Sequence, residues 1–149
     1  MLAELLQSKF ECFRCFETDD LEKVLSFCER VSVSAGEHLW VEGSEENYSA
    51  FLLEGKIGIK KQTGFPGRHV VVGVYTGGSV IGELCLLTDN PRTVSADVIE
   101  SVDMVVLHSK KFEDLIEAFP LIGLSLLRHI FLCTSKRLTK SYDRIATVF

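Results

Sequence analysis

The sequence predicts a mainly β domain with flanking helices, and three observations support this fold class. About seven short segments of strand character follow one another between residues 30 and 108, separated by turns, most of which contain glycine. No segment long enough for a helical crossover separates consecutive strands, so we expect an antiparallel sandwich, jelly roll or barrel. Helical periodicity is concentrated at the two ends of the chain.

The first 28 residues predict two short helices. Apolar residues recur at helical spacing from Leu2 to Phe13. Asp19, with Glu22 three residues further on, resembles a capping box ahead of Leu21, which predicts the start of the second helix.

From Arg30 the hydrophobic period changes to two, as expected for strands. Val31 and Val33 alternate with serines, and Glu54-Gly55 between two apolar segments is a hairpin signal. Trp40 falls on one of these strands and is expected in the core. The predicted strand segments are 31–33, 38–41, 50–53, 56–60, 70–75, 95–99 and 102–108.

The chain ends in two predicted helices over about residues 109–144. Ser109 is expected to cap the first, and Pro120 suits the first turn of the second. The second helix is apolar nearly all round in its first half, so we expect it to be buried on more than one side there, and basic in its second half. Without a linker or an internal repeat, residues 1–149 are expected to form a single domain.

The composition excludes several classes of protein. With 46% hydrophobic and 25% charged residues the chain resembles an ordinary globular protein rather than a disordered or collagen-like one. A net charge of −5 and a pI near 5.4 argue against direct nucleic-acid binding. No secretory signal is visible at the start, and no apolar window reaches the roughly 20 residues of a spanning helix. We therefore expect a cytoplasmic protein without a membrane span.

The sequence offers neither a metal site nor a catalytic motif. Its five cysteines are expected to be reduced and packed as small apolar residues. Cys12 and Cys15 form a Cys-x-x-Cys pair, but a zinc site needs a second pair, and the four histidines are scattered. We expect no metal ligands, no catalytic residues and no enzymatic activity.

Residues 77–98 carry the features that strands and turns alone do not explain. Gly82 permits close backbone approach, and amide groups at the start of a short helical turn after it would point toward an anion. Arg92 could supply the fork of donors that matches a phosphate. Glu83 would repel that phosphate unless it is aimed elsewhere, for instance at a ribose hydroxyl. Alternatively, Glu83 and Arg92 form a surface ion pair without function.

These residues resemble a known family. Gly-Glu-Leu-Cys-Leu-Leu over residues 82–87, followed by Pro-Arg-Thr over 91–93, is similar to the phosphate-binding cassette of the cyclic nucleotide-binding domain family. Two upstream strand-and-turn motifs, over residues 35–44 and 50–57, resemble those of the family in order and spacing. The resemblance spans about residues 10 to 140. It implies an antiparallel β-roll, a double-stranded β-helix or jelly roll, with a C-terminal lid or dimerisation helix.

The resemblance also implies roles for the cassette residues. Glu83 would bind the ribose 2′-hydroxyl and Arg92 the cyclic phosphate. Thr93 would contact the phosphate and is at a position associated with accommodating the guanine amino group. The backbone of the remaining cassette residues would complete the phosphate cradle: Gly82, Leu84 and Cys85. Cys85 stands where alanine is usual, and Val94 where a smaller residue is common.

The C-terminal helix would cap the base, with Arg137, Leu138 and Ser141 as candidate lid residues. The implied function is a regulatory module that binds cAMP or cGMP, needs no other cofactor, and signals by moving that helix. Family transcription factors add a helix-turn-helix domain after it, and here the chain stops at Phe149, so direct DNA binding is not expected.

The main alternative is a nucleotide-independent scaffold. Its final helix would pair two chains into a homodimer or dock on an effector protein. The helix offers four apolar residues at near-heptad spacing: Leu124, Leu127, Phe131 and Leu138. An enzyme is the third alternative and lacks visible acid, base or metal groups.

Overall fold

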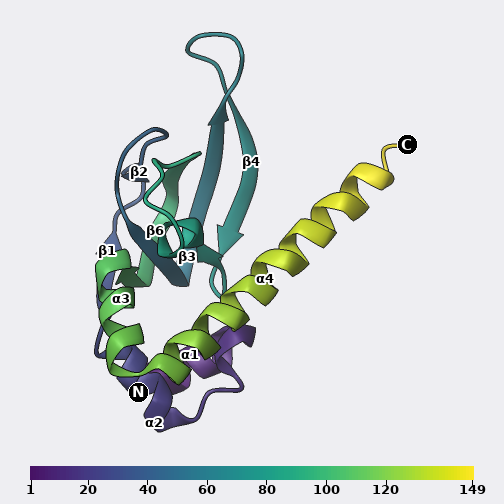
Figure 1. Cartoon of the computed structure of the whole chain (residues 1–149). Helices are drawn as coiled ribbons and strands as arrows, with labels where there is room; N and C mark the ends of the chain where they lie inside the picture. Colours follow the sequence, from purple (N-terminus) through teal and green to yellow (C-terminus); the bar gives the residue numbers. More distant parts are fainter.

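The computed structural model describes residues 1–149 as a curled antiparallel sheet with helices at both ends of the chain (Figure 1). In chain order the elements are α1 (Leu2–Lys9), η1 (Glu11–Phe13), α2 (Thr18–Leu25), β1 (Glu29–Val33), β2 (His38–Trp40), β3 (Tyr48–Gln62), β4 (His69–Thr76), β5 (Val80–Ile81), η2 (Glu83–Leu86), β6 (Ser95–His108), α3 (Ser109–Ala118) and α4 (Pro120–Ala146). The elements η1 and η2 are short 3₁₀ helices. The predicted fold class, mainly β with flanking helices, is confirmed.

Two long strands dominate the sheet. It has six strands in the order β1-β6-β3-β4, with β2 also paired to β6 and β5 to β3. Every pairing is antiparallel. The register between β3 and β6 shifts repeatedly, as expected where a sheet bends on itself. This curling makes a roll whose concave side holds apolar side chains.

The predicted hairpin at Glu54-Gly55 is wrong, because β3 runs through it without a turn. Gly55 has a φ of +98°, and a Cβ there would lie 2.3 Å from the carbonyl oxygen of Ser101 on β6. The glycine therefore permits a close strand crossing at a bulge, where the register shifts, and not a reversal of the chain. The predicted turn between the segments 95–99 and 102–108 is likewise absent, since both belong to β6.

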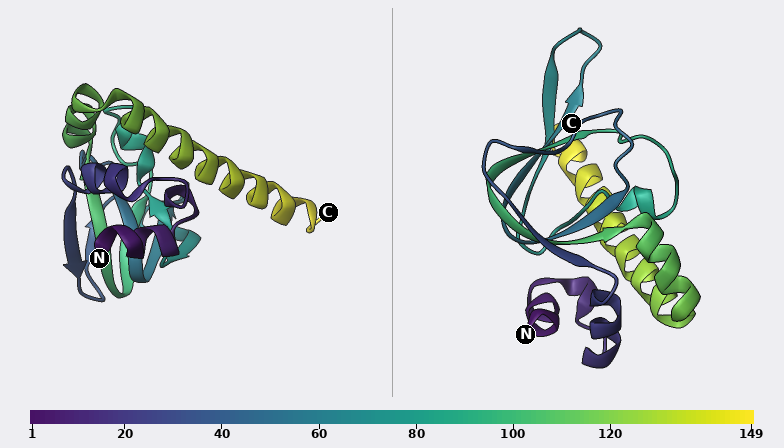
Figure 2. Two further views of the ribbon diagram at one scale, coloured as in Figure 1. Left: turned by 90° about the horizontal axis from the view of Figure 1, so that it is seen from below. Right: turned by 90° about the vertical axis from the view of Figure 1, so that its left-hand side faces the viewer.

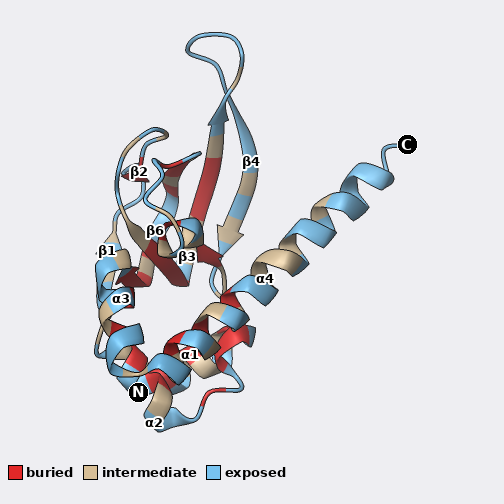
Figure 3. Cartoon of the chain, in the orientation of Figure 1, coloured by how far each residue is buried: buried red, intermediate tan, exposed pale blue.

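Apolar side chains fill two layers, one on each side of the sheet. Figure 3 shows the buried residues in red, on the long strands and on α1 and the first half of α4. The layer under the helices includes Phe10, Phe13, Phe51 and Phe112, with the rings of Phe10 and Phe51 edge to face at 6.0 Å. Burial of one such ring contributes about 1.5–3 kcal/mol. The layer inside the roll contains Trp40, confirming it as a core residue.

The N-terminal segment contains the two expected helices, but the second begins differently. Helix α2 starts at Thr18, so Asp19 lies inside its first turn and does not cap it, and no side chain caps this end. The negative charges of Asp19 and Asp20 still suit a helix N-terminus because of the helix dipole. Cys12 lies in η1, a 3₁₀ turn rather than the stripe of an α-helix.

The C-terminal helices begin within a residue of their predicted positions. Ser109 is the first helical residue of α3 and its hydroxyl caps nothing, whereas Pro120 opens α4 as expected. Helix α4 passes beside the roll, and its C-terminal end projects beyond it (Figure 2). No helix reaches the length and apolarity that a membrane-spanning helix requires.

The predicted burial of α4 on more than one side is wrong. Its buried residues are Gly123, Leu126 and Ile130, which lie along one face. Leu124 and Phe131 on other faces are 51% and 70% exposed. One chain has too few elements around α4 to cover its apolar residues.

Candidate ligand-binding site

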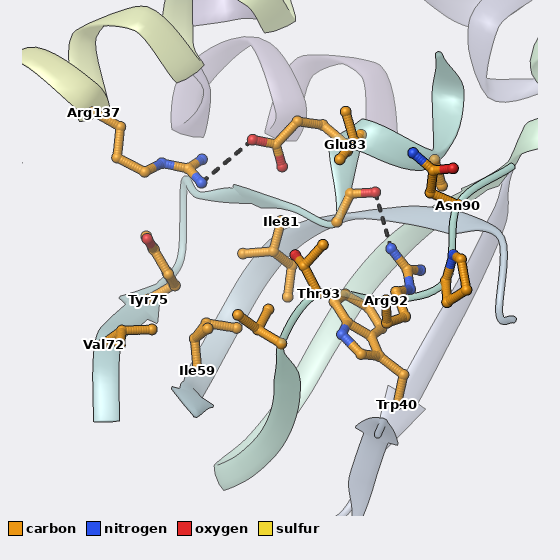
Figure 4. Close-up of a pocket in the computed structure, with 15 residues that line it drawn as sticks. Trp40, Ile59, Val72, Tyr75, Ile81, Glu83, Asn90, Arg92, Thr93 and Arg137 are labelled. Atoms are coloured by element: carbon orange, nitrogen blue, oxygen red, sulfur yellow. Dashed lines mark hydrogen bonds and ion pairs between the residues drawn. The ribbon is translucent and has the colours of Figure 1, made fainter. Parts of the chain in front are cut away.

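A cavity of about 310 Å³ opens between the roll, η2 and α4 (Figure 4). Its walls come from segments far apart in the sequence. Its lining includes the polar or aromatic side chains of Trp40, Tyr75, Glu83, Arg92, Thr93 and Arg137.

Arg92 is buried in the wall of this cavity, with 8% of its surface exposed. Its Nη1 donates a hydrogen bond to the carbonyl oxygen of Gly82 at 3.1 Å, and its Nη2 donates to the carbonyl oxygen of Tyr48. Its backbone is held as well, because its N–H donates to Ser44 and its carbonyl accepts from Gly43, each at 2.8 Å. The loop after β2 therefore fixes Arg92 at both backbone and side chain.

Two aromatic rings surround the Arg92 guanidinium. Its central carbon lies 3.7 Å from the centre of the Trp40 ring and 5.3 Å from that of Tyr48. Cation–π contacts of this kind contribute about 0.5–2 kcal/mol. Burial lowers the pKa of Arg92 from its ordinary value, although an arginine remains charged in proteins.

No carboxylate pairs with Arg92. None of the ion pairs in the structure includes it, and its Nε is buried without a hydrogen-bond partner. The alternative of a surface ion pair with Glu83 is therefore wrong, since Arg92 is buried and Glu83 pairs with Arg137. The cavity wall thus contains a buried positive charge that lacks an anion.

Gly82 allows the backbone to approach this guanidinium. Its φ of +69° is in the left-handed region, and a Cβ there would lie 2.6 Å from Nη1 of Arg92 and 2.7 Å from the Trp40 ring. A side chain at position 82 would therefore displace the guanidinium or the indole, which lie against each other at 3.7 Å. Gly82 thus permits a close approach of the backbone to Arg92 and Trp40, while its role toward an anion stays a prediction.

Glu83 points toward α4, away from Arg92. Its carboxylate accepts a hydrogen bond from Oγ1 of Thr134 at 2.9 Å and pairs with Nη1 of Arg137 at 3.5 Å. Arg137 in turn donates to the carbonyl oxygen of Val80 and lies 4.8 Å from the centre of the Tyr75 ring. Helix α4 is therefore attached to the cavity wall at the Glu83 carboxylate, the Val80 carbonyl and the Tyr75 ring.

The six predicted cassette residues all line the cavity, including Leu84, Cys85 and Thr93. Burial raises the pKa of the Cys85 thiol, so it remains protonated. Of the three lid candidates only Arg137 lines the cavity. Leu138 faces outward at 51% exposure, and Ser141 donates back to the carbonyl oxygen of Arg137. The binding roles of these residues stay predictions.

Sequence reasoning missed three neighbours of the site. Trp40 was expected only as a core residue, and Tyr48 and Thr134 were not expected at the site at all. Each lies more than 40 positions from its partner in the chain, as with the hydrogen bond between Thr134 and Glu83. The spacing of residues along the chain does not predict contacts between such distant positions.

Comparison with known proteins gives one family. The sequence model of the cyclic nucleotide-binding domain matches residues 30–119. Among curated proteins, a lysophospholipase nte1 of Aspergillus oryzae is 28% identical over 92 residues, which are 62% of this chain and only 6% of that protein. The chain thus spans a small part of this relative, so the activity of that whole protein is not inferred for this chain.

Solved structures share the fold at low sequence identity. A cyclic nucleotide-binding domain from Methylobacillus flagellatus superposes with a TM-score of 0.86 at 21% identity, covering 99% of this chain and 82% of that one. The catabolite activator protein of Thermus thermophilus gives 0.76 at 18%, covering 92% and 62%. The regulatory domain of Toxoplasma gondii PKA, crystallised with cAMP, gives 0.70 at 19%, covering 85% and 47%. The predicted β-roll is confirmed by these likenesses.

Proposed function

Because the chain belongs to the cyclic nucleotide-binding domain family, we propose that its cavity binds cAMP or cGMP and that α4 responds to occupancy. The protein then acts as a regulatory module. We assign it no catalytic residue and no cofactor besides the nucleotide.

The unpaired charge of Arg92 is the observation that carries this proposal. Leaving a buried ion without a counterion is costly, so such a site favours an anionic partner. Arg92 already lies on the cavity wall, and its Nε has no acceptor. A cyclic phosphate is a compact anion that would neutralise the guanidinium and accept its free hydrogen bonds.

Glu83 supplies the second contact. In the proposed complex its carboxylate accepts a hydrogen bond from the ribose 2′-hydroxyl, which is a neutral donor and is not repelled. Because Glu83 faces α4 and not Arg92, it adds little repulsion against the phosphate. The family likeness to a regulatory domain crystallised with cAMP supports the same ligand class.

The same carboxylate explains how α4 would respond. Thr134 and Arg137 hold the Glu83 carboxylate. A ribose hydroxyl that bonds to Glu83 changes the interactions these two side chains make. A ligand can shift α4 only by the difference between its affinities for the two helix positions, and Glu83 provides such a difference.

Calorimetric titration with cAMP and with cGMP tests the proposal. Arg92→Ala should weaken binding by about 2–5 kcal/mol, the range for truncating one partner of a buried charge pair. Arg68→Ala is the matched control, because Arg68 is exposed outside the cavity. Absence of binding of either nucleotide to the wild type, or unchanged binding by Arg92→Ala, would contradict the proposal.

A second candidate function, a nucleotide-independent dimeric scaffold, is favoured by the outer face of α4. Leu124, Phe131 and Leu138 are each at least half exposed. Beside them a second cavity, of about 1020 Å³, lies between α4 and η2 and has Leu84 and Leu87 in its wall. The α4 helix of a second copy would cover these apolar residues. Sedimentation of the empty protein distinguishes the candidates: a dimer that nucleotide does not alter favours the scaffold.

A further inference from the structure

The base of a cyclic nucleotide bound as proposed would lie beside Arg137. In a nucleoside the base is attached to C1′, next to the C2′ that carries the hydroxyl assigned to Glu83. Arg92 lies on one side of the cavity, whereas Arg137 lies on the other with Val72 and Tyr75 (Figure 4). With the phosphate at Arg92 and the hydroxyl at Glu83, the base is directed toward Arg137.

We propose that Arg137 selects guanine over adenine, so that the preferred ligand is cGMP. This inference rests on the proposed function, because it requires a cyclic nucleotide in the cavity. It assigns Arg137 as the specificity-determining residue of the lid helix.

The structure fixes Arg137 before any ligand arrives. Its Nη2 donates to the carbonyl oxygen of Val80, its Nη1 lies 3.5 Å from Glu83, and its guanidinium lies 4.8 Å from the centre of the Tyr75 ring. These three contacts use two of its five N–H donors. The guanidinium therefore has donors left for a ligand and is already oriented at the cavity wall.

Hydrogen-bond chemistry then separates the two bases. Guanine presents two acceptors side by side, O6 and N7, whereas adenine presents the acceptor N7 next to the N6 amino donor. A guanidinium has donors only, so it can bond both guanine atoms but meets a donor on adenine. A bidentate contact of this kind gives about tenfold discrimination or more, equivalent to about 1.4 kcal/mol.

Thr93 is the other polar side chain that could discriminate, through the guanine 2-amino group. Cyclic inosine monophosphate separates the two residues, because hypoxanthine keeps O6 and N7 but lacks the 2-amino group. If Arg137 sets selectivity, cIMP binds like cGMP. If Thr93 sets it, cIMP binds like cAMP.

The test is calorimetric titration of cGMP, cIMP and cAMP into the full chain and its variants. The wild type should bind cGMP and cIMP at least about tenfold more tightly than cAMP. Arg137→Ala should bring the three affinities together by weakening cGMP and cIMP most. Arg137→Gln should shift the preference toward cAMP, because a glutamine amide pairs with adenine N6 and N7. Arg144→Ala, an exposed arginine on the same helix, should leave the ratios unchanged.

The outcomes distinguish this inference from the proposed function. If no nucleotide binds the folded wild type, the proposed function itself fails. If nucleotides bind but cAMP is equal or tighter, or if cIMP behaves like cAMP, the inference is overturned and the proposed function stands. Equal weakening of all three ligands by Arg137→Ala would also overturn it, because Arg137 would then act only through Glu83. Thermal melting of each variant verifies that it is folded.

Discussion

At the scale of single residues, the site depends on a close stack of Gly82, Arg92 and Trp40. The guanidinium lies on the indole face at 3.7 Å, and the glycine backbone passes directly against both. A buried cation held by aromatic faces and carbonyl oxygens is oriented without being neutralised. The stack thus keeps Arg92 available to an anion.

Gly82→Ala should abolish most nucleotide binding. The added methyl group would lie 2.6 Å from Nη1 of Arg92, so the guanidinium must shift. Gly36→Ala is a sharp control, because Gly36 also has a positive φ, +91°, but nothing lies within 4 Å of a Cβ there. Both variants should lose about 1 kcal/mol of stability from backbone strain.

Calorimetry and thermal melting on the two glycine variants check this prediction. Only Gly82→Ala should lose affinity, by at least about tenfold, since the displaced arginine loses a charge-assisted bond. Equal affinities in the two variants would show that the stack does not position Arg92.

Residues of the site were predictable where the motif is local and unpredictable where the contact is distant. Gly82, Glu83 and Arg92 lie within eleven positions of one another, so their pattern is visible in the chain. The contact of Trp40 with Arg92 depends on how β2 pairs with β6, which spacing does not encode. The direction of Glu83, toward α4, also required the tertiary structure.

At the scale of elements, α4 is attached to the site by two side chains one turn apart, Thr134 and Arg137. Both meet Glu83, which itself begins η2. Helix α4 is additionally tied to η1 by an ion pair between Lys136 and Glu11. Helix α4 therefore contacts the cavity wall, η2 and the N-terminal element η1.

Thr134→Val should loosen the second half of α4 in the empty protein. The substitution keeps the shape of the side chain and removes the hydrogen bond to Glu83, with a cost of about 0.5–1.5 kcal/mol. Thr139→Val is the control, because the Thr139 hydroxyl bonds only within the helix, to Ser135.

Amide hydrogen exchange measured by mass spectrometry tests whether the hydrogen bond between Thr134 and Glu83 stabilises α4. In Thr134→Val the peptides covering the C-terminal half of α4 should exchange faster, while those of β3 and β6 stay unchanged. Equal exchange in both threonine variants would mean that Glu83 does not hold the helix.

Element types were predictable from periodicity, whereas element ends were less so. The alternation over 50–60 and 95–108 indicates strands. Gly55 suggests a turn in the sequence, because glycine with a positive φ is favoured both at a bulge and at a turn. The pairing of β3 with β6 determines that Gly55 lies at a bulge and not at a turn. Helix α2 shows the same limit, since Asp19 in its acidic first turn resembles a cap, whereas the N-cap position is Glu17, two residues earlier.

At the scale of the whole molecule, exposed apolar side chains are most numerous on two elements, α4 and β4. Helix α4 exposes Phe131, and the edge strand β4 exposes Val70, Val72 and Val74, each at least half accessible. Large exposed apolar areas mark interaction surfaces. The helix face lies beside the larger cavity, and it is the face that we expect a second copy to cover if the chain dimerises.

Phe131→Glu should convert a dimer into a monomer without altering the nucleotide cavity. The charge would be buried against the partner helix, which is costly without a counterion. Phe65→Glu is the control, because Phe65 is exposed to nearly the same extent, 71% against 70%. Sedimentation velocity measures both, and an unchanged sedimentation coefficient for Phe131→Glu would exclude the α4 face as the dimer interface.

The indole N–H of Trp40 offers the most direct measurement of the central claim, that an anionic nucleotide binds at Arg92. It is the single tryptophan of the chain, it contacts the guanidinium, and its Nε1 is buried without a partner. In a ¹H–¹⁵N correlation spectrum it gives one resolved signal. We expect this signal to move to a saturating position on titration with cGMP, and to stay in place in Arg92→Ala. A signal that stays in place at saturating cGMP and cAMP in the wild type would contradict it.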